Sequence, residues 1–119
     1  MVKLNKIYTR TGDDGSTGLV DGTRIPKDAA RMVAIGDVDE VNSLLGVAAL
    51  HAEGEMLARI RMIQNDLFDL GADLATPGDD FEPGEMTLRM VARQVRRLAG
   101  EIDAMNEDMA APTSFTLPG

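Results

Sequence analysis

Residues 60–74 read IRMIQNDLFDLGADL, and this stretch decides the fold class. Its large apolar side chains recur at alternating steps of three and four residues, at Ile60, Ile63, Leu67, Leu70 and Leu74. That spacing places them on one face of a helix, as a seam for a second long helix. The sequence therefore predicts an all-α, up-and-down helical bundle, with this helix covering residues 55–75.

Two further segments have a helical period. The first covers residues 29–53 and has an apolar face beside a polar one that includes Asp39 and Asn42. The polar face indicates either a second contact surface or a solvated side of the helix. The last helix is predicted over residues 87–109, with Thr87 as its N-cap.

The composition suits this interpretation. A chain of 119 residues fits one domain, and a sequence with no Trp and few aromatic residues predicts an aliphatic core. The absence of cysteine and the single histidine, His51, argue against a metal site built by the protein. The net charge of −8 argues against nucleic-acid and anionic-membrane binding. No signal peptide or membrane span is recognisable, so we expect a cytoplasmic protein.

The first 25 residues have no helical period, and we expect an irregular loop before a bundle that covers residues 26–119. Residues 7–18 read IYTRTGDDGSTG. Glycines allow close backbone approach, and converging backbone N–H groups bind phosphate oxygens. Residues 1–31 carry six basic and four acidic side chains, whereas the remainder is strongly acidic. Because no Walker pattern is present, these features leave open a phosphate-binding loop or a purely structural one.

Two groups of charged side chains have alternative interpretations. The acidic group on the 55–75 helix has the spacing of a carboxylate cluster, but a solvated face is favoured over a metal site: Asp66, Asp69 and Asp73. The basic group could clamp phosphate, but the solvent face of a helix is again favoured: Arg89, Arg93, Arg96 and Arg97.

The last ten residues are predicted to be a loop that contains Phe115 and ends in Pro118-Gly119. A Pro-Gly pair usually leads into another element, and three long helices lack enough partners to close a core. We therefore expect that the chain is truncated, needs other chains, or both.

Five segments, in order, resemble the ATP:cob(I)alamin adenosyltransferases of the propanediol-utilisation and human methylmalonic-aciduria type. They are IYTRTGDDG at 7–15, RIPKD at 24–28, GDVDEVNS at 36–43, IQNDLFDLGADLA at 63–75 and SFTLPG at 114–119. The resemblance implies a five-helix bundle, of which about three helices are present here. It also implies a homotrimer with active sites at the subunit interfaces.

The resemblance implies a role for individual residues as well. The ATP triphosphate, with Mg²⁺, would be bound by loop residues and one lysine: Thr9, Arg10, Thr11, Gly12, Thr17, Gly18 and Lys27. Asp39 would pair with an arginine of the neighbouring subunit, and Phe115 would pack below the corrin ring.

In the family reaction, Co(I) attacks the 5′ carbon of ATP and triphosphate leaves, giving adenosylcobalamin. Co(I) has no proton to lose, so the lack of a histidine or cysteine base is no obstacle. The family continues past the Pro-Gly pair with an arginine-bearing helix and a last helix that this sequence lacks. A catalytically incomplete nucleotide-binding or assembly module therefore stays open as an alternative, as does a kinase or ATPase.

Overall fold

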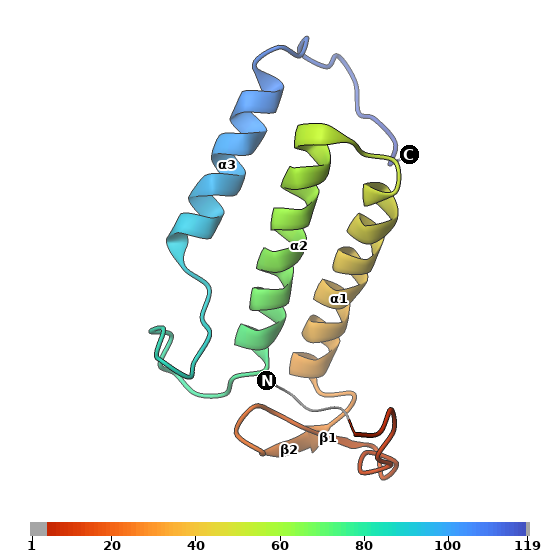
Figure 1. The fold of residues 1–119 in the computed structure, drawn as a ribbon, viewed down its shortest axis with the longest axis vertical. Coiled ribbons are helices and arrows are strands. Elements are labelled where there is room, and N and C mark those ends of the chain that lie inside the picture. Colours follow the sequence, from red (N-terminus) through yellow and green to blue (C-terminus); the bar gives the residue numbers. More distant parts are fainter. Residues whose placement is uncertain (1–4, 119) are drawn as a thin grey trace.

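The structure, a computed structural model, describes residues 5–118 and is mostly helical (Figure 1). A small hairpin of β1 (Ser16–Gly18) and β2 (Arg24–Pro26) precedes α1 (Ala30–Ala49), α2 (Gly54–Leu74) and α3 (Ala92–Asn106). The predicted helical fold class is confirmed. None of the helices within the described range has both the length and the apolar character needed to cross a membrane.

The helices α1 and α2 run antiparallel and pack along their length (Figure 1). The side-chain amide of Asn42 donates to the carbonyl of Gln64 at 3.2 Å, and the amide of Gln64 donates to the carbonyl of Asn42 at 3.2 Å. The helices lie close together here, since a Cβ at Gly46 would be at van der Waals contact, 3.4 Å, with the Gln64 amide nitrogen. The polar face of α1 is therefore partly a contact surface with α2.

The prediction that Thr87 caps the third helix is wrong. Thr87 instead forms a turn with Gly84, and the helix begins at Ala92. The backbone between Thr87 and Ala92 is not helical. There the amide of Met90 donates to the carboxylate of Asp73 on α2 at 2.8 Å. This amide therefore forms a tertiary hydrogen bond in place of a helical one.

The acidic face of α2 is not solvated, contrary to the favoured interpretation, because α3 and the segment before it attach there. Buried Asp66 forms an ion pair with Arg97 and accepts a hydrogen bond from Gln94 at 3.0 Å. The other contacts are Gln94 to Asp69 at 3.2 Å and Arg89 to Asp73 at 2.6 Å. Two of the four arginines predicted to face solvent are therefore bound to α2.

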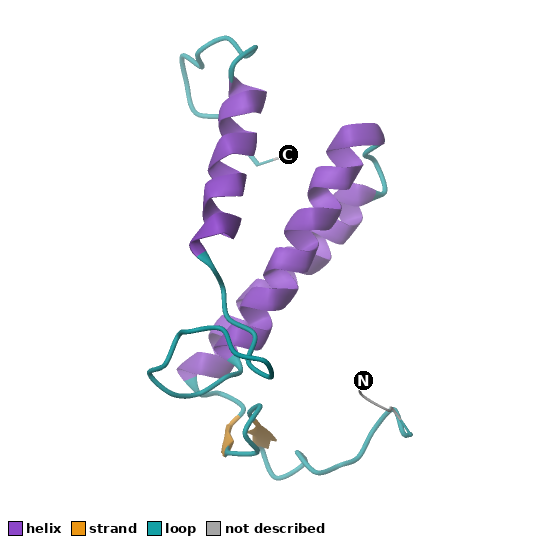
Figure 2. Ribbon diagram, turned by 60° about the vertical axis from the view of Figure 1, so that its left-hand side comes forward, coloured by secondary structure: helices purple, strands orange, loops and turns teal. Residues whose placement is uncertain are grey.

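The described part of the chain encloses little apolar surface. Beyond its first turns α3 diverges from α2 (Figure 2), and Val95 and Ile102 on it are more than half exposed. Phe68 on α2 is 73% exposed.

The N-terminal segment contains a hairpin that was not predicted. Its strands are antiparallel, with Thr17 opposite Ile25, and the turn places Gly22 at a φ of 85°. The carboxylate of Asp21 accepts hydrogen bonds from the Thr23 hydroxyl at 2.7 Å and the Thr23 amide at 2.9 Å. These two bonds hold the pKa of Asp21 below its ordinary value. The Asp21-Gly22 pair is the sequence signal that could have revealed this turn.

Candidate nucleotide-binding site

The segment before β1 folds into a tight turn. The amide of Gly15 donates to the carbonyl of Gly12 at 3.1 Å, and Gly15 has a φ of 86°. Arg10 is the non-glycine residue with a positive φ, 62°, in the described chain. Such a conformation costs on the order of 1–3 kcal/mol and often accompanies function. The Arg10 guanidinium lies 5.3 Å from the centre of the Tyr8 ring, which supports it by a cation–π contact.

Arg24 closes this turn from the opposite strand. Its Nη2 donates to the carbonyls of Thr11 at 2.8 Å and Ser16 at 3.0 Å, and its Nε donates to the Ser16 hydroxyl at 2.9 Å. Asp14 accepts from the hydroxyl and the amide of Ser16, and these bonds lower the pKa of Asp14. Sequence reasoning did not single out Arg24 as a site residue. The only signal was its place in the segment 24–28 that resembles the family.

The structure brings Lys27 to Gly12. The Lys27 amide donates to the carbonyl of Gly15 at 2.9 Å, which places its side chain against the turn. A Cβ at Gly12 would lie 3.0 Å from both Cε and Nζ of Lys27, and 2.9 Å from the carbonyl oxygen of Ser16. An ammonium group beside exposed backbone of a glycine turn is suited to binding phosphate oxygens.

The other predicted loop residues take two different positions. The hydroxyls of Thr9 and Thr11 lie 2.9 Å apart on the exposed side of the turn. Thr17 and Gly18 form β1 and pair with β2, so their backbone supports the turn as part of a sheet.

Asp39 and Phe115 are not brought to the turn within residues 5–118. Asp39 is exposed on α1 and lines a groove with Asn42 and Phe68. Phe115 is fully exposed in the C-terminal segment, which lies toward the opposite end of the helices from the hairpin (Figure 1). The described chain therefore presents these two residues away from the glycine-rich turn.

The groove at Asp39 lies between α1 and α2 and has a volume of about 320 Å³. Its walls are mostly apolar, with Asp39 and Asn42 as polar groups, and include Met32, Ile35, Val38, Leu67 and Phe68. An apolar cleft with a few polar groups is the usual form of a small-molecule site. The sequence indicated the polar face of α1, but not the contribution of Phe68.

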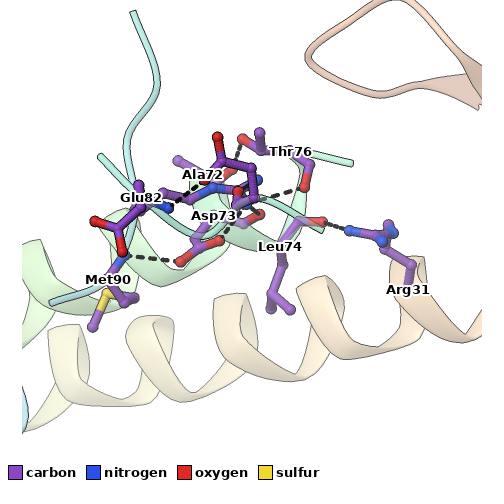
Figure 3. Close-up of polar contacts among 9 residues, drawn as sticks. Arg31, Ala72, Asp73, Leu74, Thr76, Glu82 and Met90 are labelled. Carbon is purple, nitrogen blue, oxygen red and sulfur yellow. Dashed lines mark hydrogen bonds and ion pairs between the residues drawn. The ribbon is translucent and has the colours of Figure 1, made fainter. Parts of the chain in front are cut away.

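The turn is attached to the bundle through the C-terminal end of α2. The amide of Val20, just beyond β1, donates to the carbonyl of Ala75 at 3.0 Å. Arg31 in the first turn of α1 donates to the carbonyl of Leu74 at 2.6 Å (Figure 3). The first bond therefore ties the hairpin segment to Ala75, and the second ties the start of α1 to Leu74.

Asp73, in the same turn of α2, should make this attachment sensitive to acid. Its partial burial acts to raise its pKa, but hydrogen bonds from Met90 and Arg89 outweigh this, and the pKa lies below its ordinary 3.8. The ionised Asp73 carboxylate therefore stabilises the fold above the unfolded-state pKa of about 4, and this stabilisation is lost as pH falls through the folded-state pKa.

The variant Asp73→Asn should have a lower free energy of unfolding than the parent near neutral pH. When the pH is lowered, the free energy of unfolding of the variant should fall by less than that of the parent. Urea unfolding at about pH 7 and about pH 3 measures this. An equal deficit at both pH values would contradict the prediction.

The chain is similar to known proteins over almost its whole length. The family model for cobalamin adenosyltransferase matches residues 7–119. A corrinoid adenosyltransferase of Mycobacterium bovis is 48% identical over 120 residues, which cover 99% of this chain and 62% of the relative. A corrinoid adenosyltransferase of Bacillus subtilis is 37% identical, with 96% of this chain and 58% of the relative covered.

A solved structure is also similar. It is a variant of the PduO-type ATP:corrinoid adenosyltransferase of Lactobacillus reuteri in complex with cobalamin and ATP, with a TM-score of 0.82 and 32% identity. The match covers 96% of this chain and 64% of that one. The chain thus spans about three fifths of the length of these relatives. With the helical scaffold and these matches in agreement, the chain belongs to the cobalamin adenosyltransferase family.

Proposed function

We propose that the protein carrying this chain transfers the 5′-deoxyadenosyl group of ATP to cob(I)alamin, giving adenosylcobalamin and triphosphate. The observation that carries the proposal is the Lys27 ammonium beside the backbone of Gly12, in a turn closed by Arg24. Relatives of this chain are named corrinoid adenosyltransferases, and a solved relative holds cobalamin and ATP. We propose a cytoplasmic location for the reaction.

The turn would bind the triphosphate. Thr9, Thr11 and the backbone of Gly12 offer hydrogen-bond donors, and Arg10 and Lys27 supply positive charge on the exposed side. Thr17 and Gly18 would support this surface from β1. Mg²⁺, when bound, neutralises phosphate charge.

The proposed reaction needs no proton transfer by the protein. The electron pair of Co(I) forms the Co–C5′ bond while the C5′–O bond breaks, and triphosphate leaves with the electron pair of the C5′–O bond. No proton moves in this step, so a site built from hydroxyls, backbone amides and cations is sufficient. Its contribution would be alignment of the attack and stabilisation of charge on the leaving triphosphate.

Asp39 is proposed to pair with an arginine of a neighbouring copy in a homotrimer. It forms no ion pair within residues 5–118, and it stands at the edge of the α1–α2 groove. Asp39→Asn should therefore weaken subunit association about tenfold, as expected for loss of one charged interface pair. Sedimentation of the full-length protein over a dilution series measures this. Asp37→Asn removes the same charge two residues away on α1, and an equal effect in that control would contradict a specific role for Asp39.

Phe115 is proposed to pack against the corrin ring. Phe115 is completely exposed, so its phenyl ring can contact a ligand or another subunit. An aromatic group there would exclude water and a lower cobalt ligand, which would make the Co(II) precursor easier to reduce.

Product analysis tests the function. The full-length protein is incubated with MgATP and cobalamin reduced to Co(I), and adenosylcobalamin and triphosphate are measured together. Equal amounts of both products are expected. Release of ADP would instead identify a kinase or ATPase, and ATP binding without product would identify a nucleotide-binding or assembly module.

A further inference from the structure

We propose that Arg89 is a positioning residue for the phosphate-binding turn, acting through the C-terminal end of α2. It precedes α3, lies far from the turn in sequence, and has no place among the residues that would touch ATP. The inference deepens the proposed function, on which its kinetic readout rests.

Arg89 is the most buried charged residue of the described chain, with 5% of its surface exposed. Its Nη1 donates to the Asp73 carboxylate at 2.6 Å and to the carbonyls of Asp73 and Thr76 at 3.2 Å each. Its Nη2 donates to the carbonyl of Asp80 at 2.7 Å, and the Phe81 ring lies 5.4 Å from the guanidinium carbon. One side chain therefore fixes the course of the chain as it leaves α2.

Residues 73–76 comprise the last two residues of α2, its C-cap and the residue after it, a place where carbonyl groups run out of helical partners. Arg89 donates to the carbonyls of Asp73 and Thr76, and the Asp73 carbonyl also accepts from the Thr76 amide at 3.0 Å. The carbonyls between them, of Leu74 and Ala75, accept from Arg31 and Val20. Figure 3 shows Arg31 reaching Leu74 while Asp73 receives the amide of Met90. Four successive carbonyls are thus shared between Arg89 on one side and the hairpin and α1 on the other.

The consequence for the phosphate-binding turn is geometric. Val20 follows β1 by two residues, so the Val20–Ala75 hydrogen bond holds the hairpin that carries the turn. Without Arg89, the Asp73 carboxylate and the carbonyls of Thr76 and Asp80 lose their shared donor. The end of α2 should then fray, and the hairpin should lose its fixed attachment. Loss of preorganisation at a binding site lowers affinity without removal of any contact to the ligand.

Arg97 provides a matched control. It also forms an ion pair with an aspartate of α2, Asp66, and it bonds to Glu101 within α3. Its described contacts do not include the end of α2. Truncation of Arg97 should therefore weaken the docking of α3 and leave the hairpin in place.

The experiment compares Arg89→Met, Arg89→Lys and Arg97→Met in the full-length protein. Arg89→Met should raise the KM and the Kd for MgATP about tenfold and change the KM for the corrinoid less than about twofold. Arg89→Lys keeps the charge beside Asp73 but cannot reach all the carbonyls, so it should recover part of the loss. Arg97→Met should lower the Tm with an unchanged KM for MgATP.

Amide hydrogen exchange gives a readout independent of turnover. The Val20 amide should exchange faster in Arg89→Met than in the parent, and at the parent rate in Arg97→Met. Equal MgATP affinity and equal Val20 exchange in the two methionine variants would overturn the inference. If Arg89→Met does not fold, Arg89→Lys decides by the same two measurements. A parent protein that makes no adenosylcobalamin would refute the proposed function, whereas MgATP affinity and Val20 exchange would still decide the role of Arg89.

Discussion

Replacement of Lys27 by alanine in the full-length protein is expected to weaken MgATP binding by about 10- to 100-fold. One charge-assisted hydrogen bond contributes about 1.5–3 kcal/mol, and that range corresponds to this loss of affinity. The reason lies in the placement of the side chain, since Nζ stands beside the backbone of Gly12 on the exposed face of the turn. Calorimetry with MgATP measures the effect directly.

Two further variants test whether the loss of MgATP affinity is specific to Lys27. Arg93→Ala removes one positive charge from the exposed surface of α3, so it reports the effect of net charge alone. Lys27→Arg keeps the charge but changes its shape, and should bind MgATP with an affinity between those of the parent and the alanine variant. An unchanged affinity in Lys27→Ala would exclude this residue from the nucleotide site.

The substitution Gly12→Ala is expected to reduce MgATP affinity at least as strongly. The new methyl group would lie 3.0 Å from Cε and Nζ of Lys27 and 2.9 Å from the carbonyl oxygen of Ser16. The lysine can swing away, although that removes its charge from the turn. The Ser16 carbonyl cannot move freely, because it is bonded to Arg24 at 3.0 Å. Either adjustment disrupts the proposed phosphate site.

Gly100→Ala is the matched control for Gly12→Ala. A Cβ at Gly100 in α3 would meet nothing within 4 Å, and alanine favours a helix over glycine by about 1 kcal/mol. This variant should therefore keep its ATP affinity and gain slightly in stability. Since Gly12→Ala and Lys27→Ala act on the same contact, the double variant should lose less than the sum of the two single losses. Additive losses would show that the two residues act separately.

The helical scaffold could be predicted because its signals are local. The three- and four-residue steps of apolar side chains in α2 define one face of a helix whatever the partner is. The turn at residues 7–18 was likewise visible from its glycines. Its side chains Thr9 and Thr11 do lie together on an exposed surface. The assignment of Lys27 to the same site came from family resemblance, and the structure places it at Gly12.

Other features depend on residues far apart in the sequence, and local patterns misjudged them. Asp66 and Asp73 lie on a helix face for which the sequence favours solvation, yet they receive Arg97 and Arg89 from a later segment. Thr87 is a residue type that often caps helices, but the Met90 amide donates to Asp73 and α3 begins only after it. The three-residue strands of the hairpin are too short to show a strand period.

Side-chain spacing and short motifs are enough to indicate a helical protein, an N-terminal turn rich in glycine and hydroxyl groups, and the resemblance to a family. Contacts between residues far apart in the sequence make Arg24 close the turn, bring Lys27 against Gly12 and place Arg89 at the end of α2. A buried charge or a helix-end carbonyl binds the donor that the folded chain brings near it. No local pattern of residues specifies that donor.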